Sequence, residues 1–122
     1  MARILLADDE AATRDFVKRA LEQDSHEIVA ATEGAEALAL LTASPNGFDL
    51  LITDYQMPAM DGLSLAEKAS KVKPAMPILL MSGFTIDRSQ LTVAGANIVG
   101  LVPKPFTLEQ IRAQTKLALR AG

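Results

Sequence analysis

The run Leu50–Asp54, which reads LLITD, constrains the fold of this chain more than any other stretch. Its residues are almost continuously apolar rather than alternating, which is typical of a parallel strand that helices cover on both faces. Pro58 follows closely and cannot donate to a sheet ladder, so the strand must end near Asp54. We therefore expect Asp54 at the carboxyl end of a buried strand, where open α/β sheets bind their ligands.

Four further apolar runs resemble the first, at residues 4–7, 28–31, 78–81 and 98–102. Segments with helical periodicity separate the runs, and the spacing of Thr107 and Gln110 predicts a capping box for a last helix. The segment 85–96 has the weakest periodicity, and we expect a helix there. The alternation predicts an α/β fold: a doubly wound five-stranded parallel sheet in the flavodoxin-like order 2-1-3-4-5, with helices on both faces.

Length and composition narrow the class of protein further. The 122 residues predict a single domain, 1–122. The chain has no cysteine, which excludes thiol catalysis and zinc–thiolate sites. The net charge of −3, with interspersed signs, argues against a nucleic-acid partner. No apolar run approaches a membrane span and the start lacks a signal peptide, so we expect a cytoplasmic protein without a membrane partner.

Side-chain periodicity also predicts how individual residues are placed. In the first helix, an inward-facing apolar stripe is expected to contain Ala12, Phe16, Val17, Ala20 and Leu21. His26 has no second histidine or cysteine to form a metal site with, so we interpret it as an exposed structural residue.

Polar residues follow four of the predicted strands. Asp8 and Asp9 follow the first, Asp54 ends the third, Ser82 follows the fourth and Lys104 follows the fifth. In the predicted order the topology reverses between strands 1 and 3, so these side chains should converge at one crevice. Each has a plain alternative when taken alone: a helix N-cap for Asp9, a turn former for Asp54, local capping for Ser82 and a solvated loop for Lys104.

Such a set of side chains suits phosphoryl chemistry. Three crowded carboxylates repel one another unless a cation lies among them, and Mg²⁺ prefers oxygen ligands of this kind. A carboxylate can attack phosphorus to form an aspartyl-phosphate. Mg²⁺ and Lys104 would neutralise the transferred group, and Ser82 could donate a hydrogen bond to it. The combination is that of a phosphoacceptor site.

Over essentially its whole length the chain resembles the receiver domain of two-component response regulators. The motifs that carry the resemblance are ILLADDE at residues 4–10, DYQMPAMDG at 54–62, Ser82-Gly83 and Lys104-Pro105-Phe106. The resemblance implies that a phosphorylated histidine kinase or phosphotransfer protein donates the phosphoryl group. It also implies that the Lys104–Pro105 peptide bond is often cis.

The same resemblance assigns a role to each site residue. It implies Asp54 as the phosphoacceptor, with Ser82 as the hydroxyl switch residue and Lys104 as the phosphate-contacting lysine. It implies a Mg²⁺ site made by the acids Asp8, Asp9 and Asp54 and by the backbone carbonyl of Gln56, with Asp9 the direct ligand of the Asp8–Asp9 pair.

Two positions qualify this picture. Receivers often carry an aromatic residue three positions before the lysine, where this chain has Leu101, so a coupled aromatic rotamer is absent. Phe84 is bulky and apolar two residues after Ser82. We hypothesise that Phe84 and Gln56 limit water access and set the lifetime of the phosphorylated state.

The predicted function is a phosphorylation-dependent signalling switch, not an enzyme beyond self-catalysed phosphoryl transfer and autodephosphorylation. The output is expected through contacts with a downstream effector protein. The Ser82-Gly83-Phe84 stretch and the short tail resemble CpdR-type stand-alone receivers, which act as protease adaptors; chemotaxis-type receivers and phosphorelay intermediates fit equally. One alternative is a pseudo-receiver that binds partners without turning over phosphate. Another is a haloacid-dehalogenase-like phosphatase, which needs an acid where this chain has Gln56.

Overall fold

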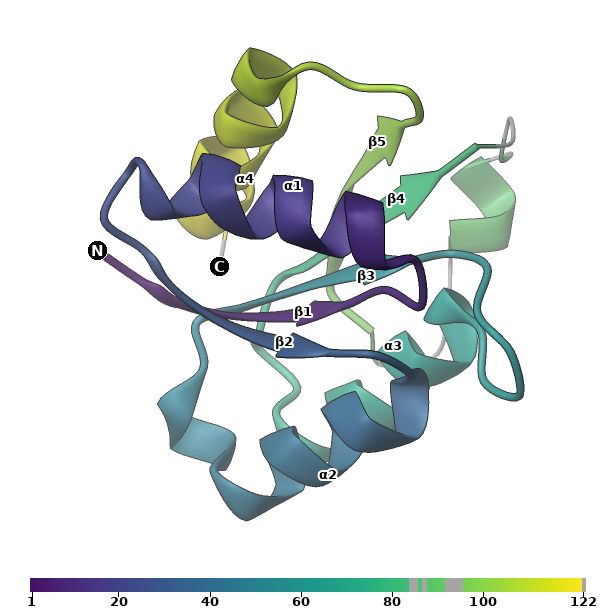
Figure 1. Ribbon diagram of the computed structural model, residues 1–122. Coiled ribbons are helices and arrows are strands. Elements are labelled where there is room, and N and C mark those ends of the chain that lie inside the picture. The colour runs from purple at the N-terminus through teal and green to yellow at the C-terminus, as the bar shows by residue number, and fades with distance from the viewer. Residues whose placement is uncertain (84–85, 87, 92–95, 122) are drawn as a thin grey trace.

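The computed structural model describes residues 1–83, 86, 88–91 and 96–121 of the chain (Figure 1). Its strands form a parallel sheet in the order β2-β1-β3-β4-β5, which confirms the predicted topology. The strands lie within two residues of the predicted runs, and their bounds are β1 (Arg3–Ala7), β2 (Glu27–Ala31), β3 (Leu50–Asp54), β4 (Ile78–Ser82) and β5 (Ile98–Pro103).

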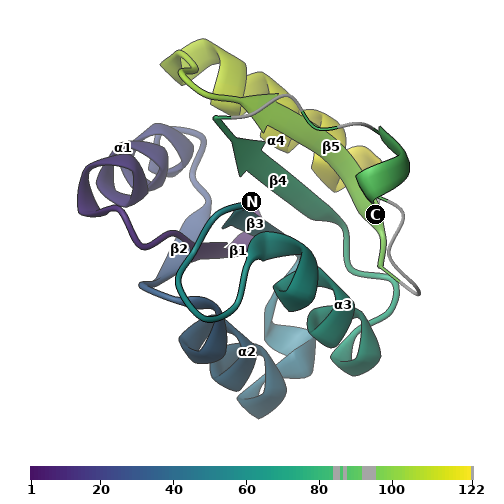
Figure 2. The same cartoon turned by 90° about the vertical axis from the view of Figure 1, so that its right-hand side faces the viewer.

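Helices cover both faces of this sheet. The described α-helices are α1 (Ala11–Glu22), α2 (Gly34–Ala43), α3 (Gly62–Val72) and α4 (Leu108–Ala121), and short 3-10 helices occupy Pro45–Gly47 and Arg88–Leu91. Helices α1 and α4 lie on one face, and α2 and α3 lie on the other (Figures 1 and 2). Of the helix expected over 85–96, residues 85, 87 and 92–95 lie outside the described residues.

Two hydrophobic clusters explain why the strands read as continuous apolar runs. Ile4, Leu50 and Ile52 face the cluster beneath α1 and α4, whereas Leu5 and Leu51 face the cluster beneath α2 and α3. All five residues of β3 are buried, because this strand lies at the centre of the sheet with layers on both sides. Burial on both faces therefore leaves β3 no position for an exposed polar side chain.

Side-chain caps fix the starts of the two helices that follow the site loops. The predicted capping box at α4 is confirmed: the Thr107 N–H donates to Gln110 Oε1 (2.8 Å), and the Gln110 N–H donates to Thr107 Oγ1 (3.1 Å). Asp61 caps α3, because its Oδ1 accepts a hydrogen bond from the Ser64 N–H (2.8 Å). Among the described residues, no helix combines the length and the apolar character that a membrane-spanning segment requires.

The prediction that an apolar stripe of α1 faces inward is wrong for its first two residues, Ala12 and Phe16. Val17 is buried, as are Ala20 and Leu21, but Ala12 is exposed and Phe16 is 40% exposed. The buried residues of α1 all lie in its second half, while its first turns border an open cavity beside the Lys104 loop. Helical periodicity gives the direction of a stripe, but it does not say where along the helix the covering neighbour ends.

His26 is half-buried rather than exposed, which also differs from the prediction. Its Nδ1 accepts a hydrogen bond from the Ala2 N–H (3.0 Å), so the ring is held against the first residues of the chain. This contact is of the structural kind, and the structural role of His26 stays a prediction.

Candidate functional site

The carboxyl ends of four strands bring the predicted site residues together. Asp8 directly follows β1, Asp54 ends β3, Ser82 ends β4 and Lys104 directly follows β5. The strand register places Asp54 beside Met81 and Ser82 beside Pro103, and the Lys104 N–H donates to the Ser82 carbonyl (2.7 Å). These residues share one edge of the sheet because parallel strands all end on the same side.

A cavity of about 340 Å³ lies at this edge and is lined by Asp9, Glu10, Asp54, Gln56, Ser82, Gly83 and Lys104. Asp54 is only 7% exposed, and Ser82 is buried. The Lys104 ammonium also lines this cavity, with its Nζ 3.0 Å from Asp54 Oδ2 and 3.8 Å from Asp8 Oδ2. One cation therefore serves two buried carboxylates.

Asp8 is fully buried, and its polar groups are unequally satisfied. Its N–H donates to the Ala31 carbonyl at the end of β2 (3.2 Å), and its Oδ1 accepts from the Glu10 N–H (2.9 Å). Its Oδ2 has no hydrogen-bond partner among the described residues, although Lys104 lies within ion-pair distance. Burial raises the pKa of Asp8, and the neighbouring Asp54 and Asp9 raise it further against the opposing effects of Glu10 and Lys104.

The three acids fit a divalent cation. One carboxylate oxygen from each of Asp8, Asp9 and Asp54 lies within 4.8 Å of the other two. Asp8 and Asp54 are buried while Asp9 is exposed, so the cluster opens toward solvent on one side. An all-oxygen donor set and an unsatisfied buried oxygen suit a hard cation such as Mg²⁺. Gln56 lines the same cavity, and its carbonyl as a further ligand stays a prediction.

The loop after β3 is held closely against the end of the strand. The Tyr55 N–H donates to the Met81 carbonyl (2.8 Å), and the Gly62 N–H donates to the Tyr55 carbonyl (2.8 Å). A Cβ at Gly62 would collide with the Asp54 carbonyl oxygen, so only glycine fits this approach. Ala59 adopts a left-handed backbone conformation (φ 67°) at the tip of the loop. These contacts hold the backbone that directly follows Asp54.

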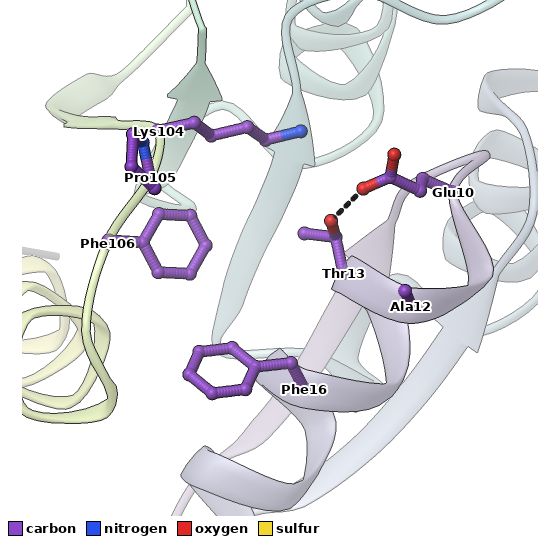
Figure 3. Close-up of a pocket in the computed structure, with 7 residues that line it drawn as sticks. All are labelled: Glu10, Ala12, Thr13, Phe16, Lys104, Pro105 and Phe106. Carbon is purple, nitrogen blue, oxygen red and sulfur yellow. Dashed lines mark hydrogen bonds between the residues drawn. The ribbon is translucent and has the colours of Figure 1, made fainter.

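A second cavity, of about 420 Å³, lies beside the first and was not anticipated from the sequence (Figure 3). Its walls come from the start of α1 and from the loop after β5, and they contain Glu10, Ala12, Thr13, Phe16, Lys104, Pro105 and Phe106. The Phe16 and Phe106 rings pack at 6.1 Å between centroids. The signal in the sequence is the pair Ala12 and Phe16, which are apolar and one helical turn apart.

Other sequence predictions fall at the edges of the site. The Lys104–Pro105 peptide bond is cis. Leu101 is half-buried on the edge strand β5. Phe84 lies outside the described residues, so its effect on the lifetime of a phosphorylated state stays a prediction. The placement of Asp8, Asp9, Asp54, Ser82 and Lys104 agrees with the sequence analysis, while their individual roles stay predictions.

Comparison with known proteins gives consistent matches. The family model for the response regulator receiver domain matches residues 4–116. The response regulator receiver protein CpdR of Brucella abortus is 34% identical over 111 residues, which cover 91% of this chain and 91% of that protein. The sensor kinase CckA of the same species is 31% identical over 115 residues, 94% of this chain, but the match spans only 12% of the kinase.

Solved structures match over nearly the whole chain. A response regulator receiver domain protein from Clostridium thermocellum superposes with a TM-score of 0.87 at 26% identity, covering 98% of this chain and 95% of that one. The chemotaxis protein CheY4 of Vibrio cholerae superposes with a TM-score of 0.86 at 27% identity, covering 97% and 98%. The chain spans about half the length of another relative, the mycobacterial response regulator MprA, at 50% of that protein.

Proposed function

The chain belongs to the response regulator receiver family, and from this premise we propose that it is a phosphorylation-dependent signalling switch that accepts a phosphoryl group on Asp54. The observation that carries the proposal is the buried Asp54 carboxylate, 3.0 Å from the Lys104 ammonium, in a cavity that Asp9 and Ser82 also line. A nucleophilic carboxylate, a fixed cation and a hydroxyl are the groups that phosphoryl transfer to an acid requires.

The transfer itself is a simple displacement. A carboxylate oxygen of Asp54 attacks phosphorus, and the new O–P bond forms as the P–N bond of a phosphohistidine breaks. The leaving imidazole nitrogen takes up a proton, and Asp54 becomes an acyl phosphate. In this scheme Lys104 offsets the negative charge of the phosphoryl oxygens, and the Ser82 hydroxyl donates a hydrogen bond to one of them. The donor is a phosphorylated histidine kinase or phosphotransfer protein.

The acidic cluster would hold Mg²⁺ during this reaction. Asp8, Asp9, Asp54 and the backbone carbonyl of Gln56 are the proposed ligands, and Asp9 is the exposed one of the three acids. When bound, the ion supplies positive charge that offsets the carboxylates and the incoming phosphoryl oxygens. The buried Asp8 Oδ2, which lacks a hydrogen-bond partner among the described residues, supports this assignment.

The signal would leave the site through β4 and β5. The hydrogen bond from the Lys104 N–H to the Ser82 carbonyl joins the ends of these strands, so a phosphoryl group that draws in both side chains would move them together. With Leu101 in place of an aromatic residue, the output would not depend on an aromatic rotamer. We propose that residues 1–122 form one receiver domain that acts in the cytoplasm through contacts with an effector protein.

Incubation with acetyl phosphate and Mg²⁺, followed by intact-mass measurement, tests the proposal. We expect the wild-type protein to gain the mass of one phosphoryl group, and Asp54→Asn to gain none. Asp15→Asn is the matched control, because Asp15 is an exposed aspartate on α1 whose ion pair with Arg19 lies outside the site.

The possible failures have different meanings. A wild-type protein that gains no mass would support a pseudo-receiver that binds partners without accepting phosphate. A gain that persists in Asp54→Asn would place the acceptor elsewhere in the chain. Either result would overturn the proposed function.

A further inference from the structure

Arg14 lies on the first turns of α1 and contacts the loop that carries the acidic pair. Its Nη1 donates a hydrogen bond to the backbone carbonyl of Asp8 (2.8 Å), and its side chain is half-buried. The helix fixes Arg14 from its other end, because its N–H donates to the Glu10 carbonyl (3.0 Å). Arg14 therefore reaches back from the helix to the end of β1.

This contact completes a set of hydrogen bonds around Asp8. The N–H of Asp8 is held by β2, Oδ1 is held by the Glu10 N–H and the carbonyl oxygen is held by Arg14. Only Oδ2 lacks a hydrogen bond from the described residues, and it faces Lys104 at 3.8 Å. These hydrogen bonds thus hold Asp8 in an orientation that leaves Oδ2 facing Lys104.

The carbonyl that Arg14 holds belongs to the peptide bond between Asp8 and Asp9. Because a peptide unit is planar, fixing its carbonyl oxygen fixes the plane and the direction in which the chain enters Asp9. Asp9 is exposed, so burial does not hold its side chain in place. A guanidinium is suited to this task, since it is always charged and forms strong, directional hydrogen bonds.

We propose that Arg14 is a positioning residue for the cation site: by holding the Asp8 carbonyl, it sets the geometry in which Asp8 and Asp9 bind Mg²⁺. The inference rests on the proposed function, because it concerns the same acidic cluster. Arg14 contacts a backbone carbonyl and does not line the Asp54 cavity, so its effect should appear in cation affinity rather than in the transfer step at saturating cation.

Three variants separate the hydrogen bond from the charge. Arg14→Met keeps the length of the side chain without a donor, and Arg14→Lys keeps the charge with a shorter donor. Arg19→Met is the matched control because it removes the same charge from the same helix. Within the part of the chain that the structure describes, Arg19 pairs with Asp15 alone, at 3.2 Å, and its side chain is 76% exposed. Urea unfolding of each variant first shows that the proteins compared are folded.

Mg²⁺ affinity is measured by calorimetry without a phosphodonor, and the fluorescence of Tyr55, the single tyrosine in a chain without tryptophan, gives a second readout. We expect Arg14→Met to bind Mg²⁺ at least tenfold more weakly, which is typical when a partner that orients a metal ligand is removed. Arg14→Lys should lie between, and Arg19→Met should match the wild type. Phosphoryl uptake by Arg14→Met should need more Mg²⁺ for its half-maximal rate, yet approach the wild-type maximum.

Equal Mg²⁺ affinity in Arg14→Met and wild type would overturn the inference, and so would equal losses in Arg14→Met and Arg19→Met. If Arg14→Met fails to fold, the affinity of Arg14→Lys decides, since an unchanged value would also overturn it. A wild-type protein that binds Mg²⁺ but gains no phosphoryl mass would refute the proposed function and leave this affinity comparison valid. A wild-type protein without Mg²⁺ affinity would refute both.

Discussion

At the amino ends of the strands polar side chains are paired with backbone groups, whereas at the carboxyl ends three carboxylates lie close together and Lys104 pairs with two of them, Asp8 and Asp54. The Arg3 guanidinium lies over the Phe48 ring at 4.7 Å and donates to the Gly47 carbonyl (3.3 Å), and Asp49 accepts from the Arg3 N–H (2.8 Å). Lys73 donates to the Phe48 carbonyl. At this end of the sheet, the charged side chains of Arg3, Asp49 and Lys73 have hydrogen-bond partners within the protein.

At the carboxyl ends of the strands, negative side chains outnumber positive ones. Lys104 lies between Asp54 and the buried Asp8, Asp9 remains at the surface, and Asp8 Oδ2 lacks a hydrogen bond from the described residues. The same buried strands therefore end in two different environments. The amino end therefore contributes stabilising contacts, while the carboxyl end keeps a destabilising set of like charges that a cation or a phosphoryl-transfer partner can use.

Removing the packing at the amino end should give the largest effect on stability. Phe48 is 2% exposed, and we expect Phe48→Ala to lower the free energy of unfolding by about 3–5 kcal/mol, measured by urea titration. Phe48→Leu is the milder control. Both should keep wild-type Mg²⁺ affinity wherever they remain folded. A loss of Mg²⁺ affinity in folded Phe48→Leu would show that the two ends are not independent.

Neutralising a carboxylate at the carboxyl ends of the strands should raise stability rather than lower it. We expect Asp8→Asn to raise the free energy of unfolding in Mg²⁺-free buffer by about 1–3 kcal/mol, since it removes a buried charge with an unsatisfied oxygen. Phosphoryl uptake should fall sharply in the same variant.

The pH dependence of folding stability gives a second test of the effect of Asp8. Because its pKa is raised in the folded protein, folding favours the protonated form, and the penalty from ionised Asp8 fades as the pH falls through that raised value. The stability advantage of Asp8→Asn should therefore shrink in acid. A variant less stable than the wild type at neutral pH would contradict this account.

The smallest effect on stability is expected from His26, which precedes β2 and accepts a hydrogen bond from the Ala2 N–H at the start of the chain. Burial lowers its pKa, the positive N-terminus and Lys116 lower it further, and Asp24 opposes them. The unfolded state therefore takes up the proton first, and the stability from neutral His26 should decline as the pH falls below about 6.5. His26→Gln should flatten this decline in urea titrations between pH 7 and 5. An equally steep decline in the variant would assign it to other groups.

The sequence predicted the sheet because burial on both faces imposes continuous apolar runs, and Leu50–Asp54 is the clearest of these. It predicted that Asp8, Asp54 and Lys104 would meet because parallel strands end on one side. Such predictions rest on topology, which apolar patterning specifies strongly.

Contacts that depend on where an element stops were not predictable in this way. The exposure of Phe16 depends on how far the neighbouring elements extend along α1. The hydrogen bond from Arg14 to the Asp8 carbonyl joins a side chain to a backbone oxygen, and residue type does not encode such a pairing. The half-burial of His26 was not predictable either, because it accompanies a hydrogen bond between the His26 side chain and the Ala2 backbone N–H.

The most direct test of the contrast between the two ends is urea unfolding with and without Mg²⁺ at matched ionic strength. A cation that binds only the folded protein stabilises it, by about 2.7 kcal/mol at a hundredfold excess over the dissociation constant. We predict a stabilisation of this kind in the wild type and in Phe48→Leu, and none in a protein carrying both Asp9→Asn and Asp54→Asn. A wild-type protein whose unfolding is unaffected by Mg²⁺, or a double variant stabilised as much as the wild type, would contradict the account.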